Sequence, residues 1–246
     1  MANPILTEAQ ASKQSIYEIV ALADAEHLPG TVGMLDDGRR FRYVYNESAV
    51  TYPVGQLLVS NVTAHNDQVA AVNSIGQRRV TFTAGAVCVA RQFLNGYLAL
   101  NLGTALGHSY RIVDHPVLAA AAAQWVLLED GLTVATDATT EFTLMSNPCW
   151  SPQISVVDQL DLPVGVPLVA ITDDTCGWVQ YHGECAVLAG TGAAAARGTC
   201  LTIDGGVGDE GAVGTKDADI EAPCGISLIA QVDTEYLPVY LSLGYP

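Results

Sequence analysis

A pattern of apolar and turn-forming residues occurs twice in this chain, sixty positions apart. Residues 162–183 read LPVGVPLVAITDDTCGWVQYHG, and residues 222–244 read APCGISLIAQVDTEYLPVYLSLG. The shared positions are Pro163, Gly165, Leu168, Ala170, Asp173 and Val179 in the first copy, and Pro223, Gly225, Leu228, Ala230, Asp233 and Val239 in the second. Proline is tolerated where a strand starts, because it need not donate to the ladder there, and glycine in a strand indicates a bulge or a close backbone approach. The pattern therefore predicts a strand–turn–strand unit used twice, and such a unit must pack on neighbours to bury its apolar face.

The differences between the two copies favour a unit of construction over a reactive site. The second copy keeps the proline, the glycine, the apolar positions and one aspartate, but it has no counterpart of Asp174, Cys176, Trp178 or His182. The residues that recur are those that two strands and a turn require. The residues that are lost are those that a reactive site would require. Large aromatic side chains often anchor cores and interfaces, so Trp178 is predicted to be a core or interface anchor.

The chain after Gly30 is predicted to be β throughout. Residues 31–46, TVGMLDDGRRFRYVYN, read as two strands joined at Asp37-Gly38, which is a strong hairpin signal. Further apolar runs follow at a spacing of about 8–12 residues, which is typical of sandwiches and barrels. YPVGQLL (52–58) is similar to a partial third copy of the repeat. We expect an all-β chain with an antiparallel β-sandwich or barrel-like fold.

The first thirty residues have a different pattern. SKQSIYEIVALADAEH carries apolar residues at helical spacing, and Pro29-Gly30 ends the segment. The segment is predicted to be either a short helix or an extended arm that becomes ordered against a neighbouring molecule. Ile16, Tyr17 and Ile19 are the apolar interface candidates within it.

Three regions follow from these patterns. Residues 1–30 form the N-terminal arm or helix, residues 31–158 a β domain, and residues 159–246 a β region that contains the repeat. The last two regions are also compatible with one common domain.

The net charge argues against two classes of partner, and the start of the chain bears on where it is made. The formal charge is −16, with ten Lys and Arg against twenty-six Asp and Glu. Such a field repels nucleic acids and anionic membranes, so neither is an expected partner. The start MANPILTEAQASKQ lacks the basic and apolar regions of a secretory signal, and synthesis in a cytoplasm is expected.

The sequence predicts no metal site and no cofactor, and it leaves open whether the acidic loops bind calcium, whose ligands are oxygens. No pair among the six cysteines has the C-x-x-C spacing of a zinc site. Most of them lie in apolar runs, where a reduced cysteine is simply a small buried residue. GGVGDEG (205–211) matches the glycine spacing of a dinucleotide-binding loop, but no helical pattern follows it and its acids would face the phosphates.

Three sets of polar residues are possible acid–base groups. Asp114-His115 precedes a proline, which favours a turn, and His182 with Glu184 follows the first copy of the repeat. Asp173 and Asp174 are adjacent carboxylates of the kind that glycoside hydrolysis needs, but they fall in a predicted turn. The sequence therefore predicts a protein that is not an enzyme.

Three segments together resemble the capsid decoration, or cement, proteins of the heads of tailed bacteriophages. These segments are LDDGRRFRYVY (35–45), GYLALNLGTALGHSYRI (96–112) and LPVGVPLVAITDDTCGWVQYHGECAVLAG (162–190). The resemblance implies a β-rich, non-catalytic virion protein on the capsid surface, present in many copies and often as trimers. The partners it implies are the major capsid protein and other copies of the same chain.

Two alternatives remain open at the level of sequence. One is a glycan- or receptor-binding module associated with a tail or fibre, which fits the repeat equally well. The other is a virion-associated polysaccharide depolymerase, for which Asp173 and Asp174 are the available carboxylates.

Overall fold

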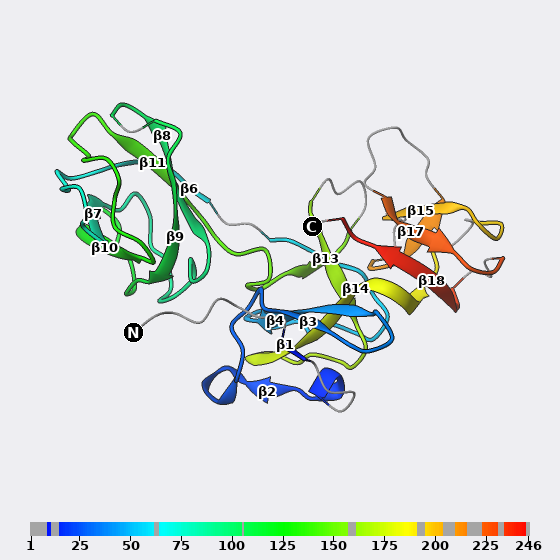
Figure 1. The fold of residues 1–246 in the computed structure, drawn as a ribbon. Helices are drawn as coiled ribbons and strands as arrows, with labels where there is room; N and C mark the ends of the chain where they lie inside the picture. Colours follow the sequence, from blue (N-terminus) through cyan, green and yellow to red (C-terminus); the bar gives the residue numbers. More distant parts are fainter. Residues whose placement is uncertain are drawn as a thin grey trace. The chain divides into compact units, whose positions relative to one another are not determined.

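A computed structural model gives the fold, and it describes residues 9–10, 15–61, 64–104, 106–156, 161–190, 195–203, 210–215, 223–230 and 234–244. These residues form strands and turns, with two short 3-10 turns and no α-helix (Figure 1). The strands belong to curled, almost wholly antiparallel sheets that form half-barrels, which confirms the predicted all-β fold. Within these ranges, no helix is long and apolar enough to span a membrane.

The chain divides into two compact units. Unit 1 comprises Met1–Asn61 and Pro148–Pro246, and unit 2 comprises the continuous segment Val62–Asn147 between them. Contacts thus group the chain differently from the division predicted at residues 158 and 159. The reason is long-range pairing, because strands between residues 40 and 59 pair with strands between residues 153 and 182.

Unit 1 contains a twelve-stranded sheet. Its strands are β1 (Ala9–Gln10), β2 (Val20–Ala21), β3 (Val32–Met34), β4 (Arg40–Asn46), β5 (Leu58–Val59), β12 (Gln153–Ile154), β13 (Pro163–Pro167), β14 (Thr175–Leu188), β15 (Cys200–Ile203), β16 (Val213–Thr215), β17 (Pro223–Ser227) and β18 (Tyr236–Ser242). The main path runs β1-β3-β4-β14-β18-β17-β15-β16, with β13 beside both β14 and β5. The hairpin predicted at Asp37-Gly38 is confirmed by the antiparallel pairing of β3 with β4.

The repeated sequence pattern forms equivalent strand pairs, which confirms its role as a building unit. In both copies the first strand is antiparallel to the second and to a third, shorter strand. The equivalent pairs of residues are Val166–Gln180 and Ile226–Tyr240, Pro167–Val179 and Ser227–Val239, and Gly165–Leu58 and Gly225–Leu201. The register is therefore the same in both copies, and the first two strands of each copy are offset by sixty residues.

The equivalence extends to two complete half-barrels. One has the strand order β12-β5-β13-β14-β4, and the other has the order β16-β15-β17-β18-β14. The first part of β14 pairs with β4 and the last part with β18, so this strand belongs to both. We call residues 40–61 with 148–182 the first repeat and residues 183–244 the second repeat. Unit 2 is inserted in the first repeat.

Two glycines show how closely the repeats correspond. Gly55 and Gly198 both have positive φ, at 73° and 83°. The Gly55 N–H donates to the Pro167 carbonyl (2.9 Å), and the Gly198 N–H donates to the equivalent carbonyl of Ser227 (2.8 Å). Residues 52–58 are therefore the counterpart of residues 195–201, and the prediction that they form a third copy of the 163–183 pattern is wrong.

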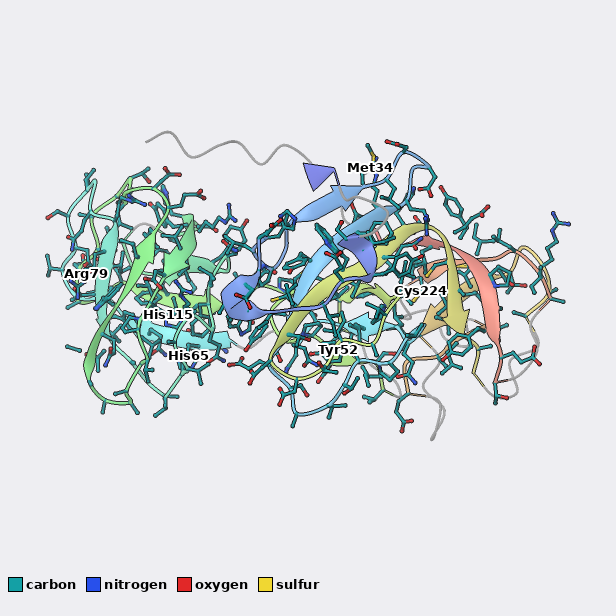
Figure 2. The ribbon with its side chains drawn as sticks, turned by 90° about the horizontal axis from the view of Figure 1, so that it is seen from below. Met34, Tyr52, His65, Arg79, His115 and Cys224 are labelled. Carbon is teal, nitrogen blue, oxygen red and sulfur yellow. The ribbon has the colours of Figure 1, made fainter. Side chains whose placement is uncertain are left out.

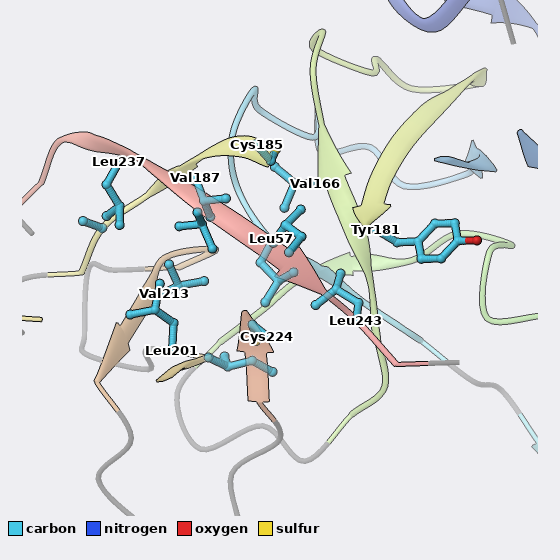
Figure 3. Close-up of a cluster of buried hydrophobic side chains, with 14 of the residues drawn as sticks. Leu57, Val166, Tyr181, Cys185, Val187, Leu201, Val213, Cys224, Leu237 and Leu243 are labelled. Carbon is cyan, nitrogen blue, oxygen red and sulfur yellow. The ribbon is translucent and has the colours of Figure 1, made fainter. Parts of the chain in front are cut away.

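The two half-barrels enclose equivalent apolar interiors. Val44, Leu58 and Val179 are fully buried in the first repeat, and their counterparts are Val187, Leu201 and Val239 in the second. Figure 3 shows the second interior, which Leu57 and Val166 of the first repeat also enter. The repeats are thus joined by a shared core as well as by β14.

Unit 2 contains a six-stranded antiparallel sheet with its own core. Its strands are β6 (Ala64–Val69), β7 (Arg79–Thr83), β8 (Tyr97–Leu102), β9 (Ser109–Asp114), β10 (Ala123–Leu128) and β11 (Glu141–Met145), in the order β6-β11-β8-β9-β10-β7. Buried side chains alternate with partly buried or exposed ones along β7 and β11, as expected for strands with one face on a core. Phe82 and Phe142 meet edge to face in that core, with ring centroids 5.1 Å apart.

Candidate protein-interaction surfaces

The N-terminal segment lies on its own chain over residues 15–24. Two 3-10 turns, η1 (Ser15–Tyr17) and η2 (Leu22–Asp24), flank β2, which pairs with Thr175 and Cys176 of β14. Of the two predicted forms, these residues resemble the extended one more than the helix, because no turn of α-helix forms. The covering contact is intramolecular.

The four predicted interface candidates have different environments. Ile16 is 1% exposed and Trp178 is 2% exposed, so both are part of the folded interior. Tyr17 and Ile19 are 54% and 39% exposed and remain accessible for a partner. The prediction that Trp178 anchors a core or an interface resolves in favour of the core.

Trp178 anchors the N-terminal segment to the sheet. Its indole meets the ring of Tyr43 at 5.0 Å and that of His27 at 5.2 Å between centroids, and His27 and Tyr43 are 5.5 Å apart. Burial raises the pKa of the Tyr43 phenol well above its ordinary value, so this phenol is neutral. Edge-to-face aromatic contacts of this kind contribute beyond the area they bury.

The adjacent aspartates lie in the predicted turn. The Thr175 N–H donates to the Thr172 carbonyl across it (3.3 Å), and Asp174 accepts a hydrogen bond from the Tyr45 hydroxyl (3.0 Å). Asp174 has a positive φ of 56°, and its counterpart in the second repeat, Thr234, has a φ of 63°. Because Thr234 has the same backbone conformation without a carboxylate, the conformation at Asp174 is explained by local structure.

The other two predicted acid–base groups also have structural partners. His182 Nε2 is 3.2 Å from the Tyr240 hydroxyl on β18. His115 is buried, its Nε2 accepts the Phe93 N–H (2.9 Å), and its Nδ1 is 2.7 Å from the Pro116 carbonyl, to which it donates. Both ring nitrogens of His115 are thereby used to hold backbone. The GGVGDEG loop falls largely on residues 204–209, which lie outside the described residues.

A buried Cys–His pair in unit 2 was not predicted. Cys88 Sγ lies 2.7 Å from His65 Nε2, although the two residues are 23 positions apart and no sequence pattern connects them. Burial raises the pKa of the Cys88 thiol to about 11 and lowers the pKa of His65. A reactive cysteine needs a lowered pKa and access to solvent, so this pair is a neutral thiol that donates to a neutral imidazole. Figure 2 shows where His65 and His115 lie in unit 2.

The described residues contain no group of three or more His, Cys, Asp or Glu side chains placed to hold a metal ion.

The buried histidines make unit 2 sensitive to acid. Burial lowers the pKa of His65 and of His115 below the value near 6.5 of an unfolded chain. The unfolded state therefore takes up protons first as the pH falls, and stability that is complete above pH 6.5 is lost progressively below it. We expect the melting temperature of unit 2, measured by calorimetry between pH 7.5 and 5, to fall with pH.

The substitution His115→Gln provides the comparison for this pH effect. It removes one buried titrating group, so the loss of stability with acid becomes shallower, while stability at pH 7.5 drops by about 1–3 kcal/mol because backbone groups lose their partner. The exposed His108, replaced as His108→Gln, is the matched control and keeps the full pH dependence. A pH dependence that His115→Gln leaves unchanged contradicts the assignment.

Unit 2 also has an exposed apolar surface, formed by residues 85–90 and 117–121. The two segments are held together by reciprocal hydrogen bonds between Cys88 and Leu118, both 3.0 Å, whose side chains are buried. Val87 and Val89 flank Cys88 in the sequence, and Val117 precedes Leu118. These three valines are 70%, 48% and 57% exposed. We call this the alanine–valine surface, because its other exposed residues are one glycine and five alanines.

The charge of the chain is distributed unequally between the units. Unit 2 carries four arginines against six acidic residues, a net charge of −2, and the remainder of the chain carries −14. The alanine–valine surface has no charged residue. An uncharged, exposed apolar surface of this kind is typical of protein–protein contact.

No protein-family model, no curated protein and no solved structure matches this chain.

Proposed function

We propose that this chain is a structural virion protein that stabilises a phage head. It binds the major capsid protein and neighbouring copies of itself, as trimers on the capsid surface, and it performs no catalysis. The residues that carry the resemblance to decoration proteins lie mainly in strands: segment 35–45 holds most of β4, segment 96–112 holds β8 and most of β9, and segment 162–190 holds β13 and β14. The segments that carry the resemblance thus belong to the framework of the fold, as suits a protein whose role is assembly.

The alanine–valine surface of unit 2 is the observation that carries this proposal. A soluble monomer seldom leaves three valines this exposed beside one another without a partner. The surface is uncharged and belongs to the unit with the smaller net charge, so it can approach a capsid with little electrostatic cost. We assign it to contact with the capsid lattice.

Cosedimentation with capsids that lack the protein tests this assignment. The wild-type chain is expected to pellet with mature capsids at a fixed ratio to capsid subunits. Val87→Asp and Val117→Asp each place a charge in the surface and are expected to weaken binding about tenfold or more, since a buried charge without a partner costs several kcal/mol.

Ile75→Asp is the matched control. Ile75 is 68% exposed and lies before the start of β7 in the sequence, whereas the alanine–valine surface begins after the end of β7. This variant is expected to bind as the wild type does. Wild-type protein that stays in the supernatant at every concentration tested excludes the proposed function, and full binding by both valine variants excludes this surface.

A further inference from the structure

The outer faces of the two half-barrels correspond residue by residue. Side chains directly opposite each other on neighbouring strands point to the same face of a sheet. The register therefore defines eight outward positions on each half-barrel. In the first repeat they are Phe41, Tyr43, Tyr45, Leu57, Val166, Cys176, Trp178 and Gln180, and in the second Glu184, Ala186, Leu188, Cys200, Ile226, Tyr236, Pro238 and Tyr240.

All eight outward positions of the first repeat are buried, and this chain itself covers them. The N-terminal segment covers one part, because η1 contacts β14 and the His27 ring packs on Trp178 and Tyr43. The second repeat covers another part, because Leu57 and Val166 are members of its core cluster.

The same face of the second repeat is open. Seven of the eight positions are exposed and the eighth, Leu188, is half-buried. Tyr236, Tyr240 and Ile226 are 54%, 40% and 48% exposed, and Ile226 lies directly between Tyr240 and Cys200 across three strands. We call these eight residues the open face. Exposed tyrosine and aliphatic side chains on a rigid sheet are typical of protein interfaces.

The tyrosines of the open face are already held in place. The Tyr236 hydroxyl donates to the Val54 carbonyl (3.1 Å), and the Tyr240 hydroxyl lies 3.2 Å from His182 Nε2. Side chains fixed before binding lose little conformational entropy when a partner arrives.

We propose that a second copy of this chain docks on the open face of the second repeat, an inference that rests on the proposed function for naming a neighbouring copy as the partner. Segments of this chain already cover the equivalent face of the first repeat. The side chains of this chain are therefore suited to packing on a face of this kind. Charge supports the same occupant. A chain of net charge −16 approaches another copy most readily where charge is scarce, and Glu184 is the single charged residue among the eight.

Sedimentation equilibrium of the purified full chain, with no capsid present, tests the docking. We expect reversible self-association at micromolar concentrations. Ile226→Asp and Tyr240→Asp each put a carboxylate into the contact and are expected to raise the dissociation constant about tenfold or more. Val69→Asp is the matched control, because Val69 is 46% exposed at the end of β6 in unit 2, outside the open face, and this variant should associate as the wild type does.

Cys200 gives an independent readout on the open face. It is the exposed cysteine of the chain, since the other five are buried. Its reaction with a thiol reagent is expected to slow severalfold as the protein concentration rises into the associating range, and Ile226→Asp is expected to keep the fast rate at the same concentration. Circular dichroism of each variant confirms that the sheet remains folded.

The outcomes separate this inference from the proposed function. A wild-type chain that stays monomeric, or association that neither Ile226→Asp nor Tyr240→Asp weakens, overturns the docking, whatever happens with capsids. Association that these variants abolish upholds it even where the chain fails to bind capsids, in which case the proposed function alone is wrong.

Discussion

Replacement of Trp178 by alanine is expected to lower the free energy of unfolding of unit 1 by about 3–5 kcal/mol, the usual range when a buried aromatic side chain is truncated. Trp178 is 2% exposed and contacts both Tyr43 and His27, so its removal leaves a cavity and also detaches the N-terminal segment from β14. A loss of this size is a large share of the stability of an ordinary domain.

Urea unfolding followed by circular dichroism measures this loss, and unit 2 provides its control. Phe142→Ala removes a fully buried ring from the core of unit 2 and is expected to cost a similar amount there while leaving the unit 1 transition in place. Trp178→Phe keeps a ring in the cavity and is expected to cost less than Trp178→Ala. A loss below about 1 kcal/mol for Trp178→Ala, which is the scale of an ordinary point mutation, contradicts the anchor role.

Alanine at either repeat glycine is expected to destabilise unit 1 by about 1–3 kcal/mol through overpacking. A Cβ at Gly225 lies 2.5 Å from the Tyr240 carbonyl oxygen, and a Cβ at Gly165 lies 2.6 Å from Val179 Cγ2 and 3.0 Å from the Gln180 carbonyl. The two sites are equivalent, but the closest atom at Gly225 is backbone, which cannot move aside as a side chain can. Gly225→Ala should therefore be the more severe substitution.

Gly244→Ala is the control for the glycine pair, because no atom lies within 4 Å of a Cβ at that position. It is expected to change the free energy of unfolding by about 0.5 kcal/mol or less, which is the range of ordinary surface substitutions. If Gly165→Ala and Gly225→Ala are as neutral as Gly244→Ala, the strands do not approach as closely as described.

The sequence predicted the local elements well because their signals are local. The Asp37-Gly38 turn and the proline–glycine pattern of β13 and β17 both depend on residues within a few positions of each other. The N-terminal segment shows the limit of this reasoning. Its helical spacing of apolar residues did not produce a helix, because Val20 instead pairs with Cys176 of β14, and Ile16 is buried in a 3-10 turn that contacts the same strand.

The candidate site residues also have some features that the sequence predicts and others that only the tertiary structure determines. The sequence placed Asp174 in a turn, but only tertiary structure pairs it with the Tyr45 hydroxyl. The contact between His65 and Cys88 joins a residue of β6 to a residue outside the named strands with no shared motif, and no rule of spacing finds it. Such contacts depend on how separate strands pack, which pairing over long sequence distances decides.

By itself, the sequence determined the all-β class, the twofold use of a strand–turn–strand unit and the absence of a recurring set of reactive residues within it. Only the tertiary structure decided that the unit is part of a half-barrel of five strands, that unit 2 is inserted in the first repeat, and that the outer face is covered in one repeat and open in the other. The physical reason is that burial of a face depends on what packs against it. Turn and strand preferences are properties of neighbouring residues, whereas the cover of a sheet comes from segments far away along the chain.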